Sequence, residues 1–223
     1  MHKFNFPILS IINSKLIVFT DGFGDFVEKL PMYLKYLIVS FLVICFLLPG
    51  IKSIPPLDRD EARFSQASKQ MLEDQNFVVI KFQDELRAKK PIGIYWVQSL
   101  SAYIFGKESI TSYRIPNVIA FITLTLVFSA FVYNIAYRYF DVAFSSAINY
   151  SLLTSILLSI IFGFAIEIKQ AKTDSILLML CTIQQLIFWK IYNYGKESWN
   201  IYKHNDHAWL VRLFWFILAL GIL

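Results

Sequence analysis

Long apolar runs, interrupted by short charged segments, constrain the fold of this chain more than any other feature. A window of about 19 residues, enough for a helix to cross about 30 Å of hydrocarbon, finds four candidate membrane spans and the beginning of a fifth. The expected spans are 33–51, 113–137, 142–166, 175–192 and an incomplete one at 209–223. Because 57% of the 223 residues are hydrophobic, more than a soluble core requires, we predict an all-α, polytopic membrane helix bundle.

The loop 52–112 is the longest polar segment between these spans. Its residues at about 60–75 follow a helical spacing that places an apolar stripe on one side. The stripe consists of Phe64, Ala67, Ser68, Met71 and Gln75. A second stretch at about 91–106 is apolar but short for a span, and it contains Gln98. We therefore expect two interfacial helices in this loop, and a re-entrant helix is the alternative for the second.

Lysine and arginine in the short loops indicate the orientation of the chain. They are in excess on the side that holds the N-terminus, Arg138 and the segment after residue 192, so we expect this side to be cytoplasmic. The loops 52–112 and 167–174 then lie on the outer face of the membrane. Two acid-bearing segments that are distant in sequence can meet there.

The charged and metal-binding residue types exclude several classes of protein. The net charge of +5 does not indicate nucleic-acid binding, because the basic residues are scattered and no basic helix is present. Anionic lipid head groups or phosphorylated substrates fit this charge better. Cys45 and Cys181 lie in apolar runs, so neither a disulfide nor a cysteine metal site is predicted. His204 and His207 have a helical metal-ligand spacing, but two ligands are too few, and no metal site is assigned.

The first 31 residues form a separate segment before the membrane domain 32–223. They begin like a signal peptide, but Pro7 and Lys15 interrupt the apolar core and no small-residue cleavage site follows. We interpret 1–31 as a cytoplasmic or interfacial extension, with Met32 as an alternative start.

Acidic residues stand at the start of the helix expected at 60–75. Asp58 and Glu61 have the spacing of a capping box, in which both acids accept from backbone N–H groups at the helix start. Capping does not explain Asp60, whose carboxylate would be partly desolvated beside Arg63 if the loop folds against the bundle. These two residues are therefore a candidate site.

Cations precede the apolar stretch at 91–106. Arg87, Lys89 and Lys90 could anchor the chain to lipid head groups, as cations at an interface often do. They could instead bind the phosphate of a lipid-linked substrate. In the second outer loop, Asp174 is either part of a helix N-cap or a further acidic site residue.

Four motifs follow one another in a characteristic order and spacing: DEARF (60–64), KPIGIYW (90–96), SYRIPNVI (112–119) and KQAKTDSILL (169–178). In these motifs the chain resembles, from about Met32 to its end, the N-terminal half of the protein mannosyltransferase and aminoarabinose transferase family, membrane enzymes of the C-type glycosyltransferase (GT-C) fold. The resemblance implies a sugar donor carried on polyprenyl phosphate. It also implies transfer at the outer face of the membrane to lipid A, a protein or another cell-envelope acceptor, by a multi-pass protein of the bacterial inner membrane.

The same resemblance implies roles for five residues. The acidic pair of the family falls on Asp60 and Glu61 and its second-loop aspartate on Asp174, which are the expected catalytic residues. The arginine and the lysine before proline fall on Arg63 and Lys90, the expected ligands of the substrate phosphate. The implied reaction is direct displacement at the anomeric carbon with inversion, in which Asp60 positions the acceptor or acts as its general base.

Two positions depart from the pattern of the aminoarabinose enzymes. Phe64 stands where they commonly have Tyr, and Lys89 stands where they have a Glu that contributes to a metal site in some members. No cofactor is therefore assigned, although those members imply a possible divalent metal.

Enzymes of the family that this chain resembles are considerably longer. Three interpretations stay open: a truncated chain, a split enzyme whose C-terminal half comes from a second chain, and a decayed membrane protein without catalysis. A channel or transporter is disfavoured because the charged residues cluster outside the expected spans.

Overall fold

The computed structural model of this chain is mostly helical. It describes residues 29–56, 58–87, 90–140, 143–161, 166–197 and 208–223. Most of the expected N-terminal extension, Lys89, and the pair His204 and His207 lie outside the described residues.

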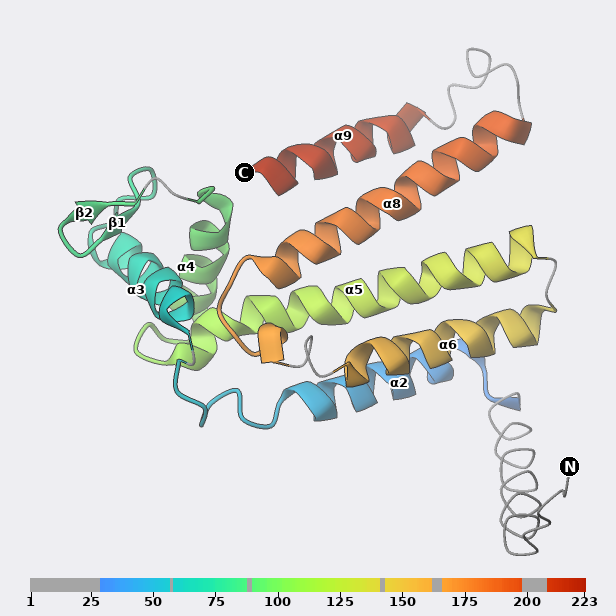
Figure 1. The fold of residues 1–223 in the computed structure, drawn as a ribbon, viewed down its shortest axis with the longest axis horizontal. Coiled ribbons are helices and arrows are strands. Elements are labelled where there is room, and N and C mark those ends of the chain that lie inside the picture. The colour runs from blue at the N-terminus through green and yellow to red at the C-terminus, as the bar shows by residue number, and fades with distance from the viewer. Residues whose placement is uncertain (1–28, 57, 88–89, 141–142, 162–165, 198–207) are drawn as a thin grey trace, which may run out of the picture.

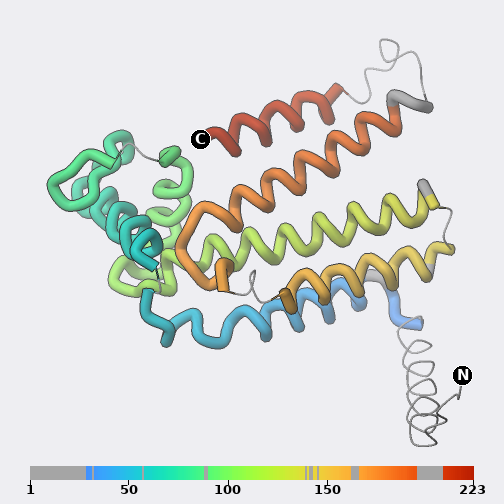
Figure 2. Tube along the Cα trace, viewed as in Figure 1, coloured from blue at the N-terminus to red at the C-terminus, as the bar shows by residue number. Residues whose placement is uncertain are grey.

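Five of the described helices run alongside one another (Figure 1). They are α2 (Met32–Leu47), α5 (Ile110–Tyr139), α6 (Phe144–Ile160), α8 (Asp174–Glu197) and α9 (Ala208–Ile222). Figure 2 shows α8 between α5 and α9, both of which it contacts. Two further helices and a hairpin gather at one end of this group: α3 (Arg59–Glu73), α4 (Gly93–Phe105), β1 (Lys81–Phe82) and β2 (Glu85–Leu86). The predicted helical class is confirmed.

Two of the described helices are long and apolar enough to cross a membrane. They are α5, over Ile110–Arg138, and α8, over Asp174–Tyr194. The other apolar helices are shorter, at Tyr33–Leu47, Ser146–Ile160 and Ala208–Ile222. That all five helices cross a membrane remains a prediction.

The main core lies where α2, α5 and α6 pack together. Leu47 of α2 and Phe121 of α5 are fully buried in it, and Ile148 of α6 packs against the same cluster. Small hydroxyl residues line the contact between α5 and α6, where the Ser129 hydroxyl donates to the carbonyl of Ser151 at 3.2 Å. Small side chains let two helix backbones approach closely, which is how helices pack where apolar burial alone gives little specificity.

A proline near the start of α5 ties this helix to α4. Pro116 has no backbone N–H, so the carbonyl of Ser112, four residues earlier, loses its intrahelical donor. The hydroxyl of Ser101 in α4 donates to that carbonyl at 2.5 Å instead. The helix interruption therefore creates the acceptor that fixes α4 against α5.

The helix α3 packs on α4 through the stripe that the sequence predicts. Phe64, Ala67, Ser68 and Met71 are all buried. The Ser68 hydroxyl donates to the side chain of Gln98 at 2.8 Å, and the Gln98 amide donates to the carbonyl of Ala171 at 3.1 Å. The prediction was wrong for Gln75, which lies beyond the helix end, exposed and in a left-handed conformation.

A β-hairpin, which was not predicted, lies at the same end of the molecule as α3 and α4 (Figure 1). Its strands pair Lys81 with Leu86 and Phe82 with Glu85. Gln70 of α3 holds the turn, because its side chain donates to the carbonyl of Gln83 at 2.9 Å and accepts from the Gln83 N–H at 3.0 Å.

The bond from Ser101 to Ser112 gives a stability prediction. Ser101→Ala should lower the free energy of unfolding by about 1–3 kcal/mol, because a buried carbonyl loses its donor. In a Pro116→Ala background the same change should cost less, because this second substitution restores a backbone N–H that can donate to the Ser112 carbonyl. Thermal unfolding of the four proteins in detergent measures both values. An equal loss in the two backgrounds would contradict this account of the proline.

Candidate functional site

A buried ion pair between Glu61 and Arg114 lies at the junction of the helices and the loops. Arg114 donates from Nε to Glu61 Oε1 at 2.7 Å and from Nη2 to Glu61 Oε2 at 3.1 Å. The side chains of Arg114 and Glu61 are 1% and 0% exposed. A bidentate pair of this kind fixes the relative orientation of both side chains as well as their distance.

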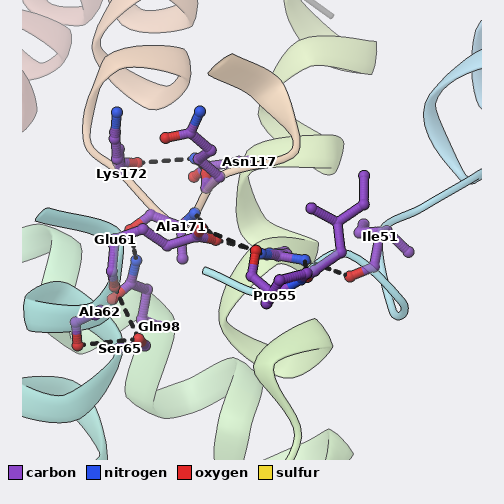
Figure 3. A network of polar contacts seen from close by, with 12 residues as sticks. Ile51, Pro55, Glu61, Ala62, Ser65, Gln98, Asn117, Ala171 and Lys172 are labelled. Atoms are coloured by element: carbon purple, nitrogen blue, oxygen red, sulfur yellow. Dashed lines mark hydrogen bonds and ion pairs between the residues drawn. The ribbon is translucent and has the colours of Figure 1, made fainter. Parts of the chain in front are cut away.

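The remaining hydrogen bonds of this ion pair reach two other segments of the backbone, the one after α2 and the one before α8. Arg114 Nη1 donates to the carbonyls of Ile51 and Ile54 at 2.8 and 2.7 Å, and Nη2 donates to that of Pro55 at 3.3 Å. The N–H of Ala171 donates to Glu61 Oε1 at 3.0 Å. Figure 3 shows Glu61 next to Ala171, with Ile51 and Pro55 at the other side of the same network.

Asn117 holds the loop that precedes α8. Its side-chain amide donates to the carbonyl of Gln170 and, at 2.9 Å, to the carbonyl of Lys172 (Figure 3). Asn117 is one turn after Arg114 in α5 and is fully buried. The start of α5 therefore fixes the segment that leads into Asp174.

Asp58 connects the loop 52–112 to the loop 167–174, both of which the sequence predicts to lie on the outer face of the membrane. As N-cap of α3 it accepts from the N–H of Asp60 at 3.2 Å, and it also accepts from Lys172 Nζ at 2.7 Å. The hydrogen bond from Lys172, followed by that from Asp60, lowers the pKa of the Asp58 carboxyl. The expected cap at Asp58 is confirmed. The expected reciprocal bond of a capping box was wrong, since the Glu61 side chain turns inward to Arg114.

Asp60 and Arg63 lie on the outer side of α3. Asp60 Oδ1 is 3.5 Å from Arg63 Nη1, and the two side chains are 54% and 36% exposed. Glu61 is thus the desolvated acid of the adjacent pair, and the expected desolvation of Asp60 was wrong. Adjacent residues of a helix point about 100° apart, so one acid can face the core while the other faces solvent.

Lys90 and Asp174 meet at a cavity of about 480 Å³. Lys90 precedes α4 and Asp174 begins α8, and the rest of the lining is mainly apolar, with Ile94, Trp96 and Leu177 among it. The structure thus brings two of the expected site residues to one cavity. Asp60 and Arg63 form a separate pair at the start of α3.

The cavity wall and the apolar cluster that contains Phe64 of α3 share two residues. Ile94 and Ile176 line the cavity and also pack in the cluster of Phe64 and Tyr95 behind α3. Within the described residues, no group of three His, Cys, Asp or Glu side chains is arranged to hold a metal ion.

Part of the chain is similar to curated proteins that share one name, undecaprenyl phosphate-alpha-4-amino-4-deoxy-L-arabinose arabinosyl transferase. A segment of 105 residues, 47% of this chain, is 26% identical to the protein from Shewanella sediminis and covers 18% of its length. A segment of 73 residues, 33% of this chain, is 34% identical to the proteins from Yersinia pestis and Yersinia pseudotuberculosis and covers 13% of their length. No protein-family model and no solved structure matches the chain. These partial matches support a glycosyltransferase-like relationship of the GT-C type.

Removing one partner of the buried pair should test its role. Arg114→Met removes the guanidinium that neutralises the buried Glu61 carboxylate and should lower the free energy of unfolding by about 3–5 kcal/mol. Arg63→Met, which removes the same side chain from the exposed pair, should cost less than about 1 kcal/mol. Chemical denaturation in detergent measures both. Similar losses for the two variants would show that burial of the pair does not control stability.

Proposed function

We propose that this chain carries the phosphate-binding and acceptor-binding part of a glycosyltransferase that uses a polyprenyl-phosphate-linked sugar. The observation that carries the proposal is the cavity shared by Lys90 and Asp174. Its mainly apolar wall suits an isoprenoid chain, and the ammonium group of Lys90, one of the lining residues, suits the phosphate. The proposed sugar donor is the one in the name of the curated proteins that match part of this chain.

The proposed reaction is a single displacement at the anomeric carbon of the sugar. The bond from this carbon to the phosphate oxygen breaks, a bond to the acceptor oxygen forms, and the configuration inverts. The polyprenyl phosphate leaves as an anion, whose growing charge Lys90 and Arg63 stabilise. When the acceptor is a hydroxyl group, its proton passes to the carboxylate of Asp60.

The acids of the site have different proposed roles. Asp60 is solvent-accessible and can contact the acceptor, whereas Glu61 is fully buried and is a positioning residue for α3. Asp174 orients the acceptor or the lysine across the cavity.

The finer identity of the reaction is also a proposal. The acceptor is lipid A or a protein hydroxyl group at the outer face of a bacterial inner membrane, which the chain crosses several times. The relatives extend far beyond the matched segments, and their remaining length is where a split enzyme would use a second chain.

The cavity can be tested by binding. The purified chain in neutral lipid nanodiscs should bind undecaprenyl phosphate more tightly than undecaprenol, and Lys90→Gln should remove about a tenfold preference for the phosphate. Lys81→Gln, an exposed cation on the hairpin, is the matched control and should leave the preference unchanged. Equal binding of phosphate and alcohol by the unaltered chain would refute the proposed function.

Transfer itself should depend on Asp60. Asp60→Asn should abolish transfer of aminoarabinose from undecaprenyl phosphate to lipid A in membranes that contain the chain, with little change in its amount. Asp74→Asn, at the other end of α3, is the control and should retain transfer. An active Asp60→Asn variant would exclude this residue as general base or acceptor-positioning group.

A further inference from the structure

Arg87 is held in a fixed position next to the proposed site, although neither the motifs nor the proposed reaction uses it. It follows β2, and its backbone N–H donates to the carbonyl of Ile80 at 2.9 Å, which extends the hairpin by one bond. Its side-chain Nε donates to the hydroxyl of Tyr95 at 2.8 Å. Its guanidinium carbon lies 5.3 Å from the centre of the Phe64 ring.

The residues that hold Arg87 are themselves rigidly packed. Phe64 of α3 and Tyr95 of α4 are 2% and 0% exposed, and their ring centres are 5.5 Å apart. A guanidinium over an aromatic face is attracted to it, and the bond to Tyr95 sets the rotation of the planar group. The helices α3 and α4 thus orient this one side chain, while the hairpin holds its backbone.

The hydrogen bond to Tyr95 uses one N–H donor of the Arg87 side chain and leaves the four N–H donors of the two terminal nitrogens available. Within the described residues, its two terminal nitrogens have no hydrogen-bond or ion-pair partner, and the side chain is partly exposed. Tyr95 is too deeply buried to contact a ligand. Arg87 is therefore the group that can reach outward, and Tyr95 is its positioning residue.

The charges around this position favour an anion as the ligand. Asp60 is already paired with Arg63, which faces it at 3.5 Å. The positive charge of Arg87 is therefore not balanced by a paired carboxylate within the described residues. Two parallel N–H groups of a guanidinium match two oxygens of a phosphate.

We propose that Arg87, held over Phe64 and bonded to Tyr95, binds a phosphate oxyanion of a lipid substrate, as a second phosphate ligand in addition to Lys90. This inference rests on the proposed function, because it assumes that phosphorylated lipids enter the site. The phosphate could belong to the sugar donor or to the acceptor lipid. The chemistry of recognition is the same for both, and the experiment separates them.

The experiment measures binding of undecaprenyl phosphate and of lipid A, with undecaprenol as the uncharged probe, to the purified chain in neutral phosphatidylcholine nanodiscs. Arg87→Gln should weaken binding of at least one phosphorylated probe by about tenfold and leave undecaprenol unchanged. Arg87→Lys should recover only part of the loss, because an ammonium cannot form the two parallel bonds. Loss for undecaprenyl phosphate assigns Arg87 to the donor, and loss for lipid A assigns it to the acceptor.

Tyr95→Phe provides a second variant that keeps the charge and the packing. It removes only the oxygen that accepts from Arg87, so it should weaken the same phosphorylated probe and leave undecaprenol unchanged. Lys81→Gln is the control for loss of a positive charge on the same hairpin.

The outcomes separate this inference from the proposed function. Suppose that the unaltered chain prefers the phosphate and that Lys90→Gln removes this preference. If Arg87→Gln and Tyr95→Phe then bind the probes as Lys81→Gln does, this inference fails and the proposed function stands. If the unaltered chain has no preference for phosphate over alcohol, both fail.

Discussion

The ion pair between Glu61 and Arg114 joins four segments of the chain at one buried point. Removing two charges from water is unfavourable, so such a pair supports a fold only when its other donors and acceptors are also satisfied. Here three backbone carbonyls after α2 accept from Arg114, and a backbone N–H before α8 donates to Glu61. This pair therefore fixes the relative positions of four segments: the end of α2, the start of α3, the start of α5 and the loop before α8.

This junction determines where the other charged residues lie. Because Glu61 points inward, Asp60 points outward beside Arg63, and Asp58 at the N-cap reaches Lys172 of the second loop. The loop is held a second time by Asn117, one turn along α5. A site on short connecting segments is precise only when their backbones are held by bonds of this kind. The buried pair thus supplies the rigidity that the exposed acids lack.

The sequence predicted those parts of the fold that depend on long apolar runs or on helical spacing over several turns. The long apolar runs form helices at the expected places, and the spacing of Phe64 and Met71 predicted the buried face of α3. The hairpin was missed because strands of two residues are too short to show alternation. The site residue that was missed is Arg114, since an arginine at the edge of an apolar run is typical of a head-group anchor. Its partner Glu61 lies 53 residues away, a contact that only the tertiary fold creates.

The layer formed by Phe64, Tyr95 and Ile94 connects the two halves of the proposed site. Arg87 lies over Phe64 and is bonded to Tyr95, while Ile94, adjacent to Tyr95 in α4, lines the cavity that Lys90 and Asp174 share. The ring of Phe64 carries no hydroxyl group that would need a hydrogen-bond partner in this layer. The helix α4 therefore carries both the residue that orients Arg87 and part of the cavity wall. Recognition of a lipid chain and of its phosphate would then depend on the same helix.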